Sequence, residues 1–189
     1  QFRNHNNSAH KDGQIRILFL SNMMESKGYL TLLDAIDILV NRYNIPLRAH
    51  IYGDFIPAKS TVYQSVDEAN IDFIRRIQVK QISDHVVLKG VVNGQEKHKE
   101  LLDADILILP TDYINEAQPV CIIEALAYGC VVTSTTHRGI PEMLDCGNAG
   151  ILIKPNSSTC IAEFVFSLVN SPSLMHKYRQ HGYMQYTKL

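Results

Sequence analysis

The sequence predicts an α/β fold: a doubly wound, parallel, six-stranded Rossmann-like sheet with helices on both faces. Short, almost continuously apolar segments alternate with longer segments of helical periodicity, which is the pattern of parallel strands buried on both faces. Right-handed crossovers favour the strand order 3-2-1-4-5-6. The expected strands are residues 15–20, 47–52, 85–89, 105–110, 131–134 and 150–155.

The segments between the strands predict helices, because their apolar residues recur at helical spacing. Asn93 and Ser157 or Ser158 are suited to cap helix N-termini. Pro119 is suited to the first position of a helix, where its missing N–H costs nothing. The expected helices are residues 29–43, 65–81, 93–103, 119–128, a short segment after Gly139, 158–170 and 172–186.

Composition excludes several classes of protein. Of 189 residues, 46% are hydrophobic and 20% charged, as in an ordinary soluble globular protein. The net charge of -1 gives no electrostatic reason to expect nucleic acid as a partner. No apolar run approaches the roughly 18–20 residues that cross a bilayer, and no signal peptide pattern opens the sequence. We therefore expect a cytoplasmic protein, and membrane contact by other segments stays open.

Residues 1–14 are polar and unpatterned, which predicts a linker or fragment start before a domain at 15–189. The four cysteines form no CxxC pair, and the eight histidines show neither HxxxH nor HExxH spacing. We expect reduced thiols and no metal site.

Two carboxylates, Glu116 and Glu124, are separated by seven residues at the start of an apolar helix. A glutamate in such a helix either lies on its surface or needs a hydrogen-bonding partner. In the predicted topology, the loops after strands one and four flank the crevice where ligands bind. Lys27, Gly28 and Glu116 are therefore expected to converge there.

These side chains suit a nucleotide sugar. A carboxylate accepts two hydrogen bonds side by side, as from vicinal sugar hydroxyls, and a lysine suits a diphosphate. Helix N-termini near 118–120 and 139–142 would add anion-binding amides. Competing sites lack their motifs: GxGxxG, GxxxxGK[ST] and GxSxG are absent, and Ser21-Asn22 lack the acidic residues of a phospho-receiver domain.

Glu116-x7-Glu124, the following Ala-Leu-Ala-Tyr-Gly129, and Gly139-Ile-Pro-Glu142 resemble the C-terminal domain of the family 4 retaining glycosyltransferases of GT-B fold. The first strand with Lys27-Gly28, and the strands at 105–110 and 150–155, match that domain as well. The resemblance extends from about Ile15 to the end of the chain. It implies one half of a GT-B fold.

The resemblance also implies roles for individual residues. Glu124 would hold the ribose hydroxyls, Glu116 would contact hydroxyls of the transferred sugar, and Lys27 would neutralise the leaving diphosphate. The base would lie near Gly90–Val92. The other expected donor-binding residues are Asn22, Gly28, Val91, Arg138 and the backbone of Ala117, Gln118, Pro119, Val120 and Cys121.

Three positions depart from the family pattern. Ser21-Asn22 stand where an arginine usually accompanies the lysine, and Glu116-Ala-Gln-Pro119 replaces Glu-Gly-Phe-Gly. Arg138 replaces a glycine; it either supplies phosphate charge or is an exposed loop residue.

The function implied is transfer of a sugar from a nucleoside diphosphate sugar with retention of configuration, as in polysaccharide biosynthesis. No metal or other cofactor is expected. The acceptor would bind an N-terminal domain absent from these residues, so we expect the chain alone to be inactive. The alternatives are a non-catalytic nucleotide-sugar-binding module and a relative of the nucleotide-sugar 2-epimerases or phosphorylases.

Overall fold

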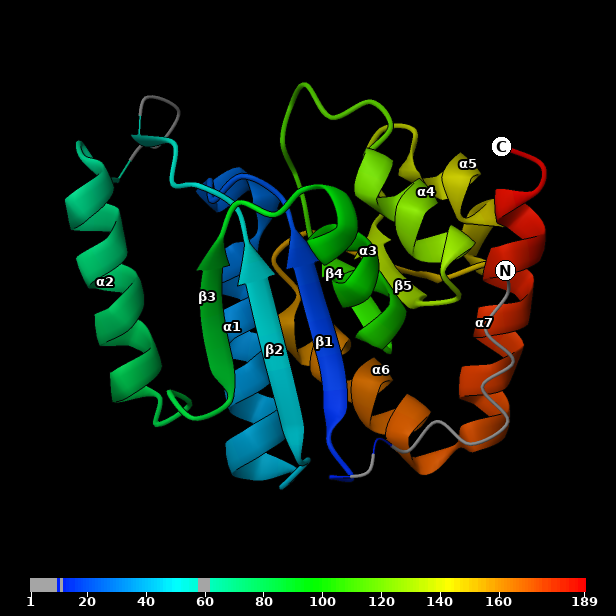
Figure 1. Ribbon diagram of the computed structural model, residues 1–189, viewed down its shortest axis with the longest axis horizontal. Helices are drawn as coiled ribbons and strands as arrows, with labels where there is room; N and C mark the ends of the chain where they lie inside the picture. The colour runs from blue at the N-terminus through cyan, green and yellow to red at the C-terminus, as the bar shows by residue number, and fades with distance from the viewer. Residues whose placement is uncertain (1–9, 11, 58–61) are drawn as a thin grey trace.

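The computed structural model describes residues 10, 12–57 and 62–189. It confirms a six-stranded sheet of order β3-β2-β1-β4-β5-β6, in which all paired strands are parallel (Figure 1). The strands are β1 (Ile15–Leu20), β2 (Leu47–Tyr52), β3 (Val86–Gly90), β4 (Ile106–Leu109), β5 (Val131–Thr135) and β6 (Ile151–Ile153).

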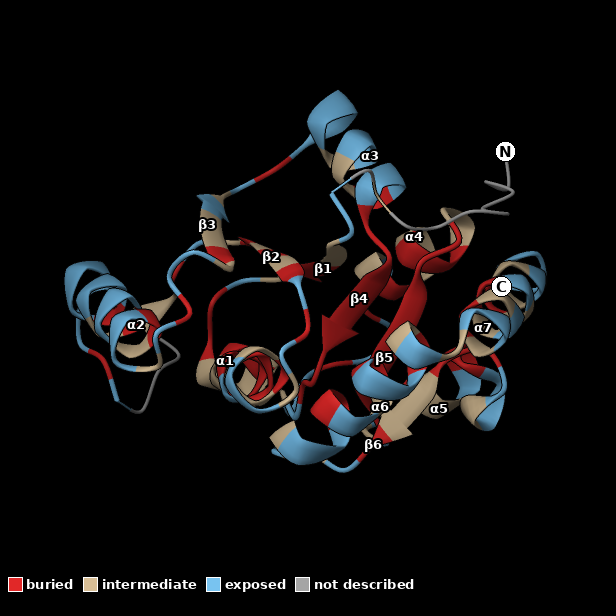
Figure 2. Ribbon diagram, turned by 90° about the horizontal axis from the view of Figure 1, so that it is seen from below, coloured by how far each residue is buried: buried red, intermediate tan, exposed pale blue. Residues whose placement is uncertain are grey.

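Helices cover both faces of the sheet. In Figure 2, α1 and α6 lie on one side, whereas α3, α4 and α7 lie on the other, and α2 stands at the β3 end. The helices are α1 (Tyr29–Asp37), α2 (Val66–Val79), α3 (Gly94–Asp103), α4 (Val120–Ala127), α5 (Ile140–Met143), α6 (Ser158–Asn170) and α7 (Pro172–Tyr186).

The predicted elements are all found, with differences at their ends. The helix expected over 29–43 leaves α-helical geometry after Asp37 and continues as a π-helical segment, Ile38–Arg42. Pro119 is the N-cap of α4, with ψ 112, and not its first helical residue. Asn93 and Ser157 occupy N-cap positions, but their side chains make no capping hydrogen bond there.

The centre of the sheet is buried on both faces. Every residue of β4 and β5 is buried, because the helices of the two layers cover them. Just before β4, Asp105 forms a buried ion pair with Arg179 of α7 at 2.6 Å. Asp105 also accepts the backbone N–H of Arg16 at 3.0 Å, so charge and hydrogen bonds fix α7 against the sheet.

Residues 1–9 and 11 of the predicted linker lie outside the described residues. Within the described chain, His10 Nε2 lies 3.1 Å from Asp105 Oδ2. The four cysteines are free. No group of histidine, cysteine and acidic side chains in the described part of the chain is arranged to hold a metal ion. No described helix is long and apolar enough to cross a membrane.

Candidate functional site

The loops after β1 and β4 lie in direct backbone contact, as the strand order predicts. Gly28 ends the β1 loop with φ 82, and a Cβ there would lie 2.3 Å from the carbonyl oxygen of Pro110. The Asp112 N–H donates to the Ser26 carbonyl at 2.8 Å. Gly28 therefore acts by letting the two loops meet.

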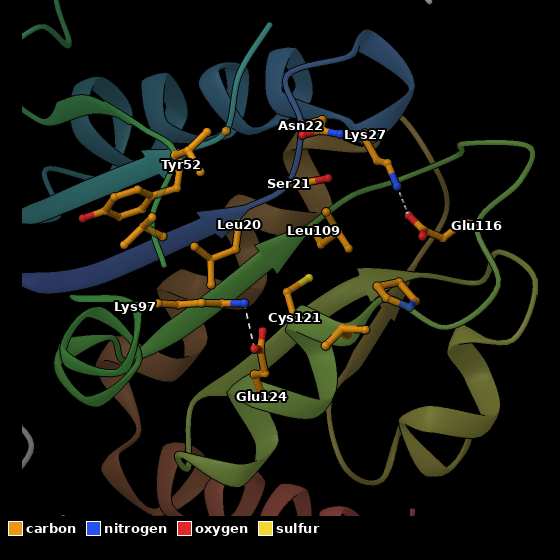
Figure 3. Close-up of a pocket in the computed structure, with 15 residues that line it drawn as sticks. Leu20, Ser21, Asn22, Lys27, Tyr52, Lys97, Leu109, Glu116, Cys121 and Glu124 are labelled. Carbon is orange, nitrogen blue, oxygen red and sulfur yellow. Dashed lines mark hydrogen bonds and ion pairs between the residues drawn. The ribbon is translucent and has the colours of Figure 1, made fainter. Parts of the chain in front are cut away.

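A cleft of about 300 Å³ opens beside this contact, at the carboxyl ends of β1 and β4 (Figure 3). Strands β1, β2 and β4, the loops that follow them, the loop after β3, and helices α3 and α4 all contribute to it, so its walls come from widely separated parts of the sequence. The lining residues are Leu20, Ser21, Asn22, Lys27, Tyr52, Gly53, Val91, Val92, Lys97, Leu109, Glu116, Pro119, Val120, Cys121 and Glu124.

Lys27 and Glu116 form an ion pair at one side of the cleft. Lys27 Nζ lies 2.5 Å from Glu116 Oε2, and the two side chains are only 12% and 10% exposed. The Thr111 hydroxyl donates to the same oxygen at 3.3 Å, and Lys27 Nζ lies 4.5 Å from the centre of the Tyr113 ring. The predicted convergence of Lys27 with Glu116 is thus confirmed.

Glu124 lies at the other side of the cleft, with Leu109 and Cys121 between the two pairs (Figure 3). Its Oε1 pairs with Lys97 Nζ of α3 at 2.7 Å. Its Oε2 is buried and has no hydrogen-bond partner among the described residues. A buried carboxylate oxygen without a donor is costly, so this atom is ready to accept a hydrogen bond from a ligand.

Lys97 is the principal residue that sequence reasoning missed, because none of the motifs that predicted the site includes the helix over 93–103. The available signal was position. Lys97 lies near the N-terminus of the helix after β3, and in this topology that end faces the ligand crevice. Leu20, Tyr52 and Leu109 were missed as well; each lies at the carboxyl end of a strand.

Cys121 lies between the two carboxylates and is not poised for nucleophilic chemistry. Burial, and then the charges of Glu116 and Glu124, raise the pKa of its thiol to about 12. The thiol stays protonated at neutral pH, as expected for a reduced, unreactive cysteine.

Some of the predicted donor-binding residues lie beside the cleft. Ala117, Gln118 and Arg138 line a second hollow of about 650 Å³, and among the residues that the structure describes only Glu116 lines both hollows. Arg138 is exposed and has φ 52, a left-handed conformation that suits the glycine it replaces. Pro119, Val120, Cys121, Asn22 and Val91 line the cleft itself.

The sequence matches the family Glycosyl transferases group 1 over residues 1–185. The chain belongs to this family. It is similar to the putative colanic acid biosynthesis glycosyltransferase WcaL of Salmonella typhimurium, with 37% identity over 46% of this chain and 22% of the relative. The amylovoran biosynthesis glycosyltransferase AmsK of Erwinia amylovora is 28% identical over 82% of this chain and 36% of the relative. The chain thus matches about a fifth to a third of these proteins' lengths.

Solved structures of glycosyltransferases share the fold. The C-terminal domain of a group 1 family protein, LpcC of Francisella tularensis, superposes with a TM-score of 0.77 at 20% identity, covering 92% of this chain and 85% of that domain. Anabaena HepE, solved in complex with UDP-glucose, gives a TM-score of 0.77 at 15% identity, covering 93% of this chain and 44% of HepE. The expected half of a GT-B fold is confirmed.

The contact at Gly28 predicts a stability difference between two glycine positions of this glycosyltransferase domain. Gly28→Ala combines left-handed strain with a collision against Pro110, so we expect it to lower the free energy of unfolding by about 3 kcal/mol. Gly13 has φ 69 but open space around it, so Gly13→Ala should cost about 1 kcal/mol. Urea denaturation measures both, and equal losses would contradict the collision.

Proposed function

We propose that this chain is the donor-binding half of a glycosyltransferase that transfers a sugar from a nucleoside diphosphate sugar with retention of configuration. One observation carries the proposal: Lys27, Glu116 and Glu124 line a single cleft, and Glu124 keeps a buried, unpaired oxygen there. In the same cleft, Lys27 can bind a diphosphate, and the two glutamates can accept hydrogen bonds from sugar hydroxyls.

The cleft suggests where each part of the donor binds. Glu124 Oε2 accepts from the ribose hydroxyls, and the base lies against the apolar wall that includes Val91 and Val92. The diphosphate lies near Lys27 and the first amides of α4. The transferred sugar contacts Glu116. Because Glu116 also lines the second hollow, we propose that the sugar is transferred toward that hollow.

The proposed chemistry is electrostatic. Lys27 stabilises the negative charge that develops on the departing diphosphate, a contribution that fixed charges make well in a site with little water. Glu116 and Glu124 orient the donor and do not attack it. Since Lys27 is held by Glu116 at 2.5 Å, the donor exchanges this pair for two others: diphosphate with lysine, and sugar hydroxyls with glutamate. The prediction that no metal is required rests on these protein charges.

Relatives suggest the donor and the pathway to test first. HepE was solved with UDP-glucose, which makes UDP-sugars the first candidates. The names of WcaL and AmsK concern colanic acid and amylovoran biosynthesis, which supports a role in polysaccharide biosynthesis. We propose that the acceptor binds a further domain, that the chain alone turns over no donor, and that the reaction takes place in the cytoplasm.

The main alternative is a module that binds nucleotide sugars without catalysis. It is favoured by Ser21 and Asn22, uncharged residues in the cleft where the resemblance leads one to expect an arginine. A 2-epimerase-like or phosphorylase-like activity is the other alternative.

We expect this chain to bind at least one of UDP, GDP and ADP, and the variant Glu124→Ala to weaken that binding more than about tenfold, because the ribose loses a charged acceptor. Isothermal titration calorimetry measures the affinities. Glu163→Ala, on the exposed surface of α6, is the control and should bind as the wild type does. Equal affinities for wild type and Glu124→Ala would refute the assigned site.

The exchange of ion pairs predicts that one variant changes the affinities for UDP and for UDP-glucose differently. Glu116→Gln releases Lys27, so UDP should bind roughly threefold or more tightly, whereas UDP-glucose should lose any advantage over UDP. Titration calorimetry with both ligands measures the ratio of the affinity for UDP-glucose to the affinity for UDP. Glu163→Gln, on the exposed surface of α6, should leave the ratio of the two affinities unchanged. Weaker UDP binding by Glu116→Gln would show that Glu116 does not restrain Lys27.

Enzyme and binding module differ in turnover once an acceptor-binding domain is present. We expect the chain joined to the preceding domain of a group 1 relative to hydrolyse or transfer from a UDP-, GDP- or ADP-sugar, and the product to keep the donor's anomeric configuration by NMR. Binding without turnover of any of these donors would favour the module, and an inverted product would refute retention.

A further inference from the structure

Lys97 belongs to α3, a helix that carries none of the site residues expected from the sequence. Its ammonium group reaches across to α4 and lies 2.7 Å from Glu124 Oε1 (Figure 3). Both side chains are 28% exposed, so the pair is neither fully buried nor free in solvent. Lys97 and Glu124 both line the cleft.

Neighbouring contacts join α3 to the segment that follows α4 and so support this pair. His98 Nδ1 contacts the Tyr128 hydroxyl group. One turn further along α3, the carbonyl of Leu101 accepts from the Cys130 thiol at 3.3 Å. The backbone that carries Lys97 is therefore fixed relative to Glu124.

We propose that Lys97 is a positioning residue that sets the ribose contact of the donor site. It holds the Glu124 carboxylate through Oε1, and this leaves Oε2, the buried oxygen without a partner among the described residues, free to accept from a ribose hydroxyl. This inference rests on the proposed function, because it assigns a task to a residue of the same cleft.

The physical reason is preorganisation. A glutamate side chain rotates about three bonds, and ordering it costs side-chain entropy. A lysine already bound to one oxygen removes part of that cost before the ligand arrives, and the other oxygen of a carboxylate can accept a charge-assisted hydrogen bond. Removal of Lys97 should therefore weaken recognition of the ribose hydroxyls and have little effect on contacts with the base and the phosphates.

The test compares UDP with 2′-deoxy-UDP, which lacks one ribose hydroxyl. Lys97→Met keeps the apolar stem and removes the charge. We expect it to weaken UDP binding roughly tenfold and 2′-deoxy-UDP binding much less, so that the preference for ribose largely disappears. Lys97→Arg should keep the preference, since a guanidinium also donates to a carboxylate. Lys99→Met, an exposed change on the same helix, is the matched control.

Titration calorimetry on the chain gives the affinities, and thermal unfolding shows whether each variant is folded. Equal losses for both nucleotides in Lys97→Met would mean a general structural effect and would overturn the assignment; an unchanged ribose preference would overturn it too. In the double variant Lys97→Met with Glu124→Gln, binding no weaker than in Glu124→Gln alone would support it. If the wild type binds none of UDP, GDP and ADP, the proposed function itself fails, and this inference with it.

Discussion

The candidate site depends on the close approach of two backbone segments, the loop after β1 and the loop after β4. Gly28 makes this approach possible because it carries no Cβ where Pro110 lies. Without the approach, Lys27 and Glu116, which are 89 positions apart in the chain, could not lie 2.5 Å apart. The parallel sheet supplies the direction of both loops, since the carboxyl ends of β1 and β4 share one edge.

Electrostatics within the cleft follow from this geometry. Each lysine that lines it is paired with a glutamate: Lys27 with Glu116, and Lys97 with Glu124. The charges of these two pairs cancel, so these side chains give the cleft no net charge that would attract a diphosphate. Under the proposed function, Lys27 would bind the diphosphate by exchanging partners. A ligand that offers both phosphate and hydroxyl groups can satisfy both members of a broken pair. The arrangement therefore favours a complete nucleotide sugar over an inorganic anion, which would leave the glutamates without donors.

Sequence reasoning could predict the sheet and half of the site because both follow from chain order. Apolar strands, helical periodicity and right-handed crossovers determine the topology, and the topology alone brings Lys27 to Glu116. Topology also brings the N-terminal end of α3 to the crevice, but it does not single out Lys97, whose position in the cleft depends on the rotation of α3 about its axis and on the reach of a long side chain. Arg138 shows a similar limit: it was expected among the donor-binding residues, but the loop conformation places it in the second hollow.

The departures from the family pattern change which hydrogen-bond donors and charges the cleft offers. Pro119 lacks an N–H, but as the N-cap of α4 it precedes the helical amides, so Val120 and Cys121 can still offer theirs. Ser21 and Asn22 leave the phosphate end of the cleft without an arginine, and Lys97 adds a cation that is held by Glu124. The loop after β1 thus provides one cation fewer than the family pattern, whereas α3 provides Lys97, beside the glutamate for which we propose ribose binding. Under the proposed function, a site with this distribution of charge should depend more on the nucleoside, and less on the diphosphate, to hold its donor.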